Sequence, residues 1–89
     1  MAHSKSALKR IRQNEKRRSY NRMYRSRART FVKKARVAQA SGDLPTAEQA
    51  TLQALKELDR AASRGVIHWR NAARRKSRLM KQLNAVKAS

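Results

Sequence analysis

Apolar residues recur at the helical period in three segments of this chain, and its few Gly and Pro residues fall between those segments. Gly42, Asp43 and Pro45 separate the first segment from the second, and Gly65 ends the second. Gly favours the left-handed conformation that ends helices, whereas Asp favours the position before a helix and Pro is tolerated in a first turn. The sequence therefore predicts an all-α fold of three helices joined by two short connections.

The apolar spacing also predicts how these helices pack. The stripe of the first helix consists of Tyr20, Tyr24, Ala28, Phe31, Ala35 and Ala38. The stripe of the second consists of Leu44, Ala47, Thr51, Leu55, Leu58 and Ala62, with Leu52 beside it. The stripe of the third consists of Trp69, Ala72, Ala73, Lys76, Leu79, Met80, Leu83 and Val86. Three amphipathic helices joined by tight turns predict an antiparallel three-helix bundle.

The chain of 89 residues fits one domain, which we divide into four parts. A basic arm covers residues 1–19, the rest of the first helix 20–41, the second helix 43–64 and the third 68–87. No apolar residue lies between Ile11 and Tyr20, so the arm has nothing to pack against a core. We expect it to extend the first helix beyond the bundle, and to be disordered or frayed when free and helical when bound.

Positive charge is concentrated in two of the three helices. The formal net charge is +19, with 24 Lys and Arg against 5 Asp and Glu. Residues 1–36 hold 14 basic and 1 acidic residue, and residues 64–89 hold 8 basic residues and no acidic one. Residues 37–63 hold 2 basic and 4 acidic residues, so the middle helix is nearly neutral. Two basic helices beside a neutral one predict a two-sided cationic surface for a polyanion.

Basic residues on the outer helices recur at steps of three or four, opposite the apolar stripes. Such a helix buries one side and offers guanidinium groups to phosphates on the other. A merely solvated charged face would mix in acidic partners, which are almost absent here. The residues predicted to bind RNA are Lys5, Lys9, Arg10, Arg12, Lys16, Arg17, Arg18, Arg22, Arg25, Arg29, Lys33, Arg36, Arg70, Arg74, Arg75, Arg78 and Lys81.

Several other side chains have two possible roles. The interleaved polar residues could bond to phosphate or sugar, or only to solvent and helix ends: Ser4, Asn14, Asn21, Ser26, Thr30, Asn71 and Ser77. The period places Trp69 toward the bundle, so core packing or partial exposure at the turn is favoured over base stacking, and Tyr20 and Tyr24 are ambiguous in the same way.

Catalysis and cofactor binding find no support in the sequence. The chain has no Cys, and its two histidines, His3 and His68, are isolated, so no metal site is predicted. His68 is expected to cap the third helix or to lie in the turn before it. No carboxylate pair or Gly-rich phosphate loop exists. We expect no enzyme, no cofactor, no small-molecule substrate, no membrane span and no secretory signal.

Several stretches together resemble the bacterial small-subunit ribosomal protein S-twenty family. They are SALKRIRQNEKRR (6–18), NRMYRSRARTFVKKA (21–35), SGDL (41–44), LDRAASRGVIH (58–68) and NAARRKSRLMKQLN (71–84). The resemblance covers nearly the whole chain. The departures are His3, where the family usually has a small polar residue, and Trp69-Arg70, where Lys and Asn are expected.

The resemblance implies a three-helix bundle with an extended first helix that binds small-subunit (30S) ribosomal RNA directly and aids subunit assembly. It implies a monomer that lies beside neighbouring ribosomal components in a cytoplasmic ribosome of bacterial or plastid type. The RNA-facing residues would be the basic ridges of the first and third helices. Two other functions remain open: a nucleoid-type or basic-zipper-like DNA-binding protein, and a membrane-active cationic helix.

Overall fold

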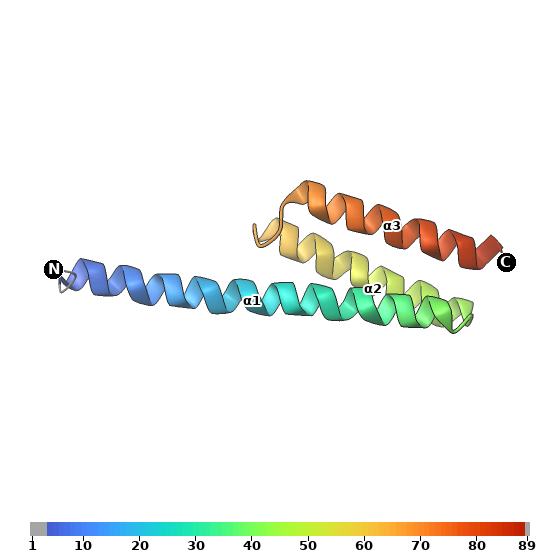
Figure 1. Ribbon diagram of the computed structural model, residues 1–89, viewed down its shortest axis with the longest axis horizontal. Helices are drawn as coiled ribbons and strands as arrows, with labels where there is room; N and C mark the ends of the chain where they lie inside the picture. The colour runs from blue at the N-terminus through green and yellow to red at the C-terminus, as the bar shows by residue number, and fades with distance from the viewer. Residues whose placement is uncertain (1–3, 89) are drawn as a thin grey trace.

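Three helices run back and forth in the computed structural model, which describes residues 4–88. They are α1 (Lys5–Ala40), α2 (Leu44–Ser63) and α3 (Trp69–Ala88), and no strand occurs within the described range. Figure 1 shows α2 running antiparallel to α1, and α3 turning back beside α2. The predicted all-α antiparallel bundle with an extended first helix is confirmed.

Local side-chain and backbone chemistry sets the ends of α1 and α2. Ser4 precedes α1 and accepts a hydrogen bond from the backbone N–H of Ala7 at 3.2 Å, as a helix cap does. Gly42 and Gly65 have φ angles of 78° and 72°, the left-handed conformation that residues with a Cβ rarely adopt. Both glycines therefore stop a helix where the sequence predicted.

The turn after α2 is a Schellman motif that also fills the core. The N–H of Gly65 bonds to the carbonyl of Ala62 at 3.0 Å, and the N–H of Val66 bonds to that of Ala61 at 2.9 Å. This pair of bonds folds the chain back, so that Val66 is buried. The start of α3 is fixed next, because His68 Nδ1 accepts from the N–H of Arg70 at 3.1 Å. His68 therefore caps α3, as expected.

The start of α2 differs from the expectation in one detail. Asp43 occupies the capping position, but its carboxylate makes no hydrogen bond to the backbone N–H groups of the helix. The carboxylate instead accepts from the Thr46 hydroxyl at 2.7 Å. Pro45 stands in the first turn, where its missing N–H has no cost.

The core is built largely from alanine. Its buried members are Ala28, Ala35, Ala54, Leu58, Ala61, Val66, Ala72 and Leu79. Small side chains allow α2 to approach both neighbours closely, but each contact removes little apolar area from water. Leu58 and Leu79 are the largest apolar side chains that are fully buried, so stability depends strongly on them.

One buried amide ties the three helices together. Gln39 of α1 donates to the hydroxyl of Thr51 of α2 at 2.9 Å and to the carbonyl of Leu79 of α3 at 3.3 Å. Buried polar groups are tolerated when their bonds are made, and these bonds require one register between the helices. The sequence did not indicate this tether, because Gln39 reads as a solvated residue near a helix end.

The structure corrects several positions that the apolar stripes assigned to packing. Trp69 is 64% exposed and Tyr20 is 41% exposed, so neither is a core residue. Trp69 is the first residue of α3, and Val66 of the preceding turn fills the end of the core in its place. Leu52, Ala73 and Met80 are also exposed, because the contact stripes are narrower than the sequence suggested.

The first helix is much longer than its partners. At 1.5 Å per residue its 36 residues span about 54 Å, against about 30 Å for the 20 residues of α2. Its N-terminal part, residues 5–19, projects beyond the bundle (Figure 1) and is exposed apart from Ala7. Residues 1–3 of the predicted arm lie outside the described residues, and so does His3. Within residues 4–88 no helix is long and apolar enough to cross a bilayer.

Candidate nucleic-acid interface

The most buried acidic side chain joins α2 to α1. Glu57 is only 4% exposed, and its carboxylate meets Arg27 Nε at 2.9 Å and Arg60 Nη1 at 3.4 Å. Both arginines are about half exposed, so solvent screens these pairs. The contact nevertheless neutralises Arg27 on the side of α1 that faces α2.

Two further ion pairs join α2 to α3. Lys76 Nζ lies 2.6 Å from Asp59, and Lys87 Nζ lies 3.1 Å from Glu48. The acidic residues of α2 thus pair with Arg27, Lys76 and Lys87 on the neighbouring helices. None of these three belongs to the residues predicted to bind RNA.

Ring contacts hold two other basic side chains that were left out of that prediction. Lys34 Nζ lies 5.1 Å from the centre of the Phe31 ring, and Arg64 Cζ lies 4.8 Å from that of Tyr24. Arg64, which caps the end of α2, also donates a hydrogen bond to the Tyr20 hydroxyl. The Arg64 contacts fasten the end of α2 to α1 at the point where the arm leaves the bundle, whereas the Lys34–Phe31 contact lies within α1.

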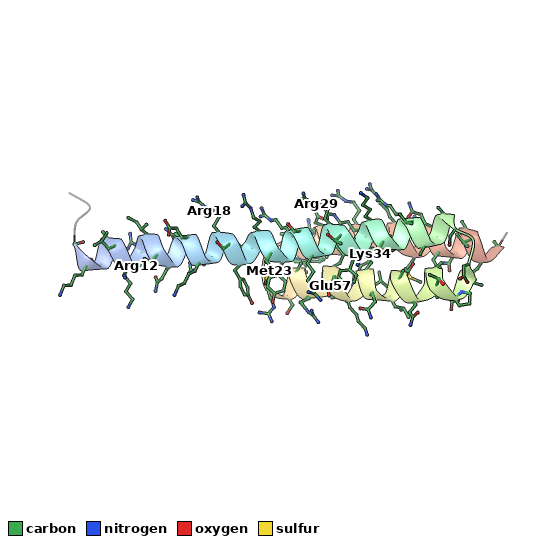
Figure 2. All side chains as sticks on the ribbon, turned by 90° about the horizontal axis from the view of Figure 1, so that it is seen from below. Arg12, Arg18, Met23, Arg29, Lys34 and Glu57 are labelled. Carbon is green, nitrogen blue, oxygen red and sulfur yellow. The ribbon has the colours of Figure 1, made fainter. Side chains whose placement is uncertain are left out.

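The basic residues predicted to bind RNA form no ion pair within residues 4–88, and they are exposed except for the half-buried Arg75. Ion pairing within these residues is therefore confined to Arg27, Lys76 and Lys87, which face α2, and to Arg60 of α2 itself. In Figure 2, Arg18 and Arg29 rise from the edge of α1 opposite to α2 and Glu57. The unneutralised charge lies on the outer surface, where a polyanion can reach it.

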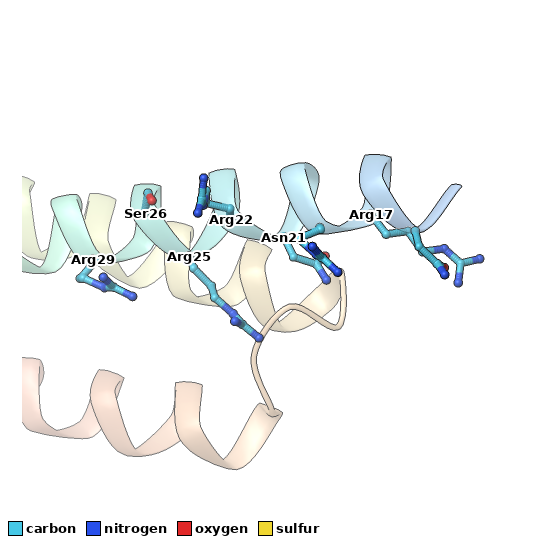
Figure 3. A pocket seen from close by; sticks show the side chains of 8 residues that line it. Arg17, Asn21, Arg22, Arg25, Ser26 and Arg29 are labelled. Carbon is cyan, nitrogen blue, oxygen red and sulfur yellow. The ribbon is translucent and has the colours of Figure 1, made fainter. Parts of the chain in front are cut away.

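A first depression runs along the flank of α1. It is lined by Asn14, Arg17, Arg18, Asn21, Arg22, Arg25, Ser26 and Arg29. Figure 3 shows Arg25 and Arg29 pointing from α1 toward the side where α3 lies, whereas Arg22 and Ser26 point to the other side. Asn14, Asn21 and Ser26 thus share a concave surface with cations, which supports the phosphate or sugar reading over plain solvation.

Two further depressions lie between α1 and α3 and continue the first. One is lined by Arg25, Ala28, Arg29, Val66, Ile67, His68, Asn71 and Arg75. The other is lined by Arg29, Val32, Arg36, Arg75, Arg78 and Leu79. Because they share Arg29 and Arg75, we treat both together as one α1–α3 groove. Arg29 lines all three depressions.

The α1–α3 groove combines cations from two helices around polar atoms. Arg25 Nη2 donates to the carbonyl of Val66 at 3.4 Å, which holds this arginine against the turn. Within the described residues, the Oδ1 atom of Asn71 is buried and has no hydrogen-bond partner. Like charges gathered in one groove repel, and an anion that enters relieves this repulsion.

Only some of the residues predicted to bind RNA line the α1–α3 groove. Arg25, Arg29, Arg36, Arg75 and Arg78 converge there, and Arg17, Arg18 and Arg22 join the adjoining flank. The remaining predicted residues are exposed but line neither surface: Lys5, Lys9, Arg10, Arg12, Lys16, Lys33, Arg70, Arg74 and Lys81. Sequence periodicity found the cations but could not show which of them meet across two helices, nor that His68 and Asn71 lie among them.

One titratable group is perturbed next to this surface. The pKa of Tyr20 is raised above 10.0, chiefly because its hydroxyl donates to the hydroxyl of Tyr24 at 3.4 Å, with a smaller contribution from burial. Arg64 opposes this shift in pKa to a lesser degree. This shift in pKa favours the protonated form of the Tyr20 hydroxyl.

Within residues 4–88, no group of three or more His, Cys, Asp or Glu side chains is placed to hold a metal ion. His68, one of the two histidines of the sequence, uses its Nδ1 atom to cap α3. The chemistry that the surface does offer is an array of hydrogen-bond donors with positive charge.

Comparison with known proteins places the chain in a family. The family described as "Ribosomal protein S20" matches residues 2–84. A "Small ribosomal subunit protein bS20" of Thermomicrobium roseum is 55% identical over 97% of this chain and 87% of its own length. Proteins of the same name from Shouchella clausii and Geobacillus thermodenitrificans are 48% and 46% identical, covering 99% and 100% of this chain and all of their own length. The chain therefore belongs to the ribosomal protein S20 family.

Proposed function

We propose that this protein binds small-subunit ribosomal RNA through the phosphate backbone, with the α1–α3 groove, the flank of α1 and the basic arm as contact surfaces. One observation carries the residue assignment. The cations that face α2 have partners inside the protein, whereas those on the outer surface of α1 and α3 form no ion pair within residues 4–88.

The family membership supports the biological setting. As a member of a ribosomal protein family, the chain is a structural constituent of the small ribosomal subunit rather than an enzyme. Its partners there are ribosomal RNA and the neighbouring ribosomal components, and it acts as a monomer in the cytoplasmic ribosome. The protein aids subunit assembly by holding RNA segments in a fixed relative position.

The mechanism is electrostatic and depends on shape. The molecule is 64 Å long but only 21 by 15 Å across, so the arm and the groove can contact phosphates of different RNA segments. Neutralising both sets of phosphates lowers the repulsion between the segments and fixes their relative position. Because side chains cannot read the deep major groove of A-form RNA, the backbone and its shape are the main features recognised.

Two alternative functions lose support from the packing. A basic zipper needs the apolar stripe of its helix for a second copy, but α2 covers Ala28 and Ala35 of α1. A membrane-active third helix needs the apolar face of α3, but Leu79 and Leu83 are buried in the bundle. Neither face is available in the folded monomer.

A salt titration tests the proposal. Filter binding of the protein to small-subunit ribosomal RNA should show a steep fall of log affinity with log salt, because each neutralised phosphate releases condensed counterions. A duplex DNA of equal length serves as the comparison and should bind more weakly at every salt concentration. A flat salt dependence, or equal affinity for the DNA, would overturn the proposal.

A further inference from the structure

Trp69 is an exposed aromatic side chain whose ring lies next to His68 and Arg70. It is the only Trp of the chain and is 64% exposed at the first residue of α3. The bundle gains little from it, since Val66 fills the end of the core. The exposed ring therefore requires an explanation other than packing within the chain.

The neighbours of Trp69 hold its ring in a stacked arrangement. The rings of His68 and Trp69 lie 5.6 Å apart between centres, at 28° to each other. His68 is itself fixed, because its Nδ1 accepts the N–H of Arg70 at 3.1 Å. The guanidinium Cζ of Arg70 lies 5.3 Å from the Trp69 ring. A ring that is already oriented loses little conformational freedom when a planar ligand stacks on it.

The surroundings of this ring favour a nucleotide as that ligand. His68 also lines the α1–α3 groove beside Arg25, Arg29 and Arg75. No acidic residue occurs from position 64 to the end of the chain. Proteins that bind unpaired nucleotides combine a cationic track for the backbone with aromatic side chains on which bases stack, and this end of the groove has both.

We propose that Trp69 stacks on an unpaired nucleobase of the RNA whose phosphates lie in the α1–α3 groove. The proposal rests on the RNA-binding function proposed above and adds a contact with a base. On binding, the base takes the place of the Arg70 guanidinium on the ring, and Arg70 is released toward a phosphate. Asn71 lines the groove next to His68, so a polar side chain also lies close to the proposed position of this nucleotide.

Intrinsic fluorescence gives a direct test, because the single Trp is the reporter. Small-subunit ribosomal RNA should quench the emission of the wild-type protein as it saturates binding, and a fully paired RNA duplex should not. Trp69→Ala should weaken binding to the ribosomal RNA by about 5- to 150-fold, the range found when stacking on one base is lost. The salt slope should not change, because no charge is removed.

Two further variants control this test. Trp69→Phe keeps an aromatic face and should recover most of the affinity. Leu52→Ala removes an exposed apolar side chain from α2 and should leave the affinity within twofold of the wild type. Circular dichroism should show unchanged helix content in each variant, since neither position is in the core.

The possible failures can be told apart. Unchanged emission at saturation, or Trp69→Ala binding with wild-type affinity, would overturn the stacking proposal while leaving the backbone-binding function intact. If Trp69→Ala binds RNA with normal affinity but is poorly incorporated into the subunit, the stacking proposal is also overturned. That result would mean that Trp69 contacts a neighbouring protein instead. Failure of the wild-type protein to bind ribosomal RNA with a steep salt slope would instead reject the underlying function.

Discussion

Arg29 is the cation on which the proposed interface most depends, because it lines the flank depression and both parts of the α1–α3 groove. Arg29→Gln removes its charge while keeping a side chain with similar helix propensity. The residue is exposed and forms no ion pair within residues 4–88, so the fold should be unaffected. We therefore expect the loss to fall on binding alone.

The magnitude follows from counterion release. One phosphate contact contributes about 0.7 to 0.9 to the slope of log affinity against log salt, for single strands and duplex DNA respectively. If the contribution vanishes near 1 M salt, its loss lowers affinity at 0.1 M by about 5- to 8-fold. Filter binding of Arg29→Gln to small-subunit ribosomal RNA over a range of salt concentrations measures both numbers.

Lys56→Gln is the matched control. It lowers the net charge by the same amount, but Lys56 is exposed on α2, away from the groove. We expect its salt slope to stay at the wild-type value and its affinity to change by less than about twofold. If both variants lose affinity and slope equally, binding depends on total charge, and the assignment of a specific interface is refuted.

Three further predictions concern stability, the arm and ionisation. Leu79→Ala should lower the free energy of unfolding by about 2–5 kcal/mol out of roughly 4–13 kcal/mol for a chain of this length, measured by urea denaturation; a loss below 1 kcal/mol would contradict the importance of this core position. Deleting residues 1–19 should remove less helix signal in circular dichroism than a fully helical arm contributes, because the free arm is expected to fray; removal of the full signal would show that the arm is already folded. The raised pKa of Tyr20 means that the protonated hydroxyl favours the folded state below pH 10.0 and that this contribution is lost as pH rises through the folded-state pKa. Tyr24→Phe should therefore lower the pKa of Tyr20 in an ultraviolet titration of tyrosinate, and an unchanged pKa would remove the hydroxyl bond as its cause.

The sequence predicted the helices well because their signals are local. Gly42 and Gly65 adopt the left-handed conformation that their positions suggested, and the alanines of the core recur at the helical period. The sequence placed Trp69 on the core-facing stripe of α3 because helical periodicity describes one helix at a time. It contains no information on Val66, the residue of the preceding turn that closes the core. Gln39 was missed because its two hydrogen bonds reach other helices, 12 and 40 residues further along the chain, and depend on how the three helices pack.

The sequence identifies the exposed cations of the proposed interface but not the surface that they form. Their spacing on each helix indicated which ones point away from the apolar stripe. The structure pairs Arg27, Lys76 and Lys87, which were not in the predicted set, with acidic residues. The meeting of Arg29 with Arg75 across two helices depends on how α3 packs beside α1, which no local pattern contains.

Lysine footprinting tests the central claim most directly, namely that the outer surface of α1 and α3 and the arm hold ribosomal RNA while α2 does not. Acetylation followed by mass spectrometry would compare the free protein with the protein in the assembled small subunit. We predict that Lys16, Lys33 and Lys81 become protected in the subunit, while Lys56 on α2 keeps the reactivity it has in the free protein. Protection of Lys56 with continued reactivity of the other three lysines would contradict the account.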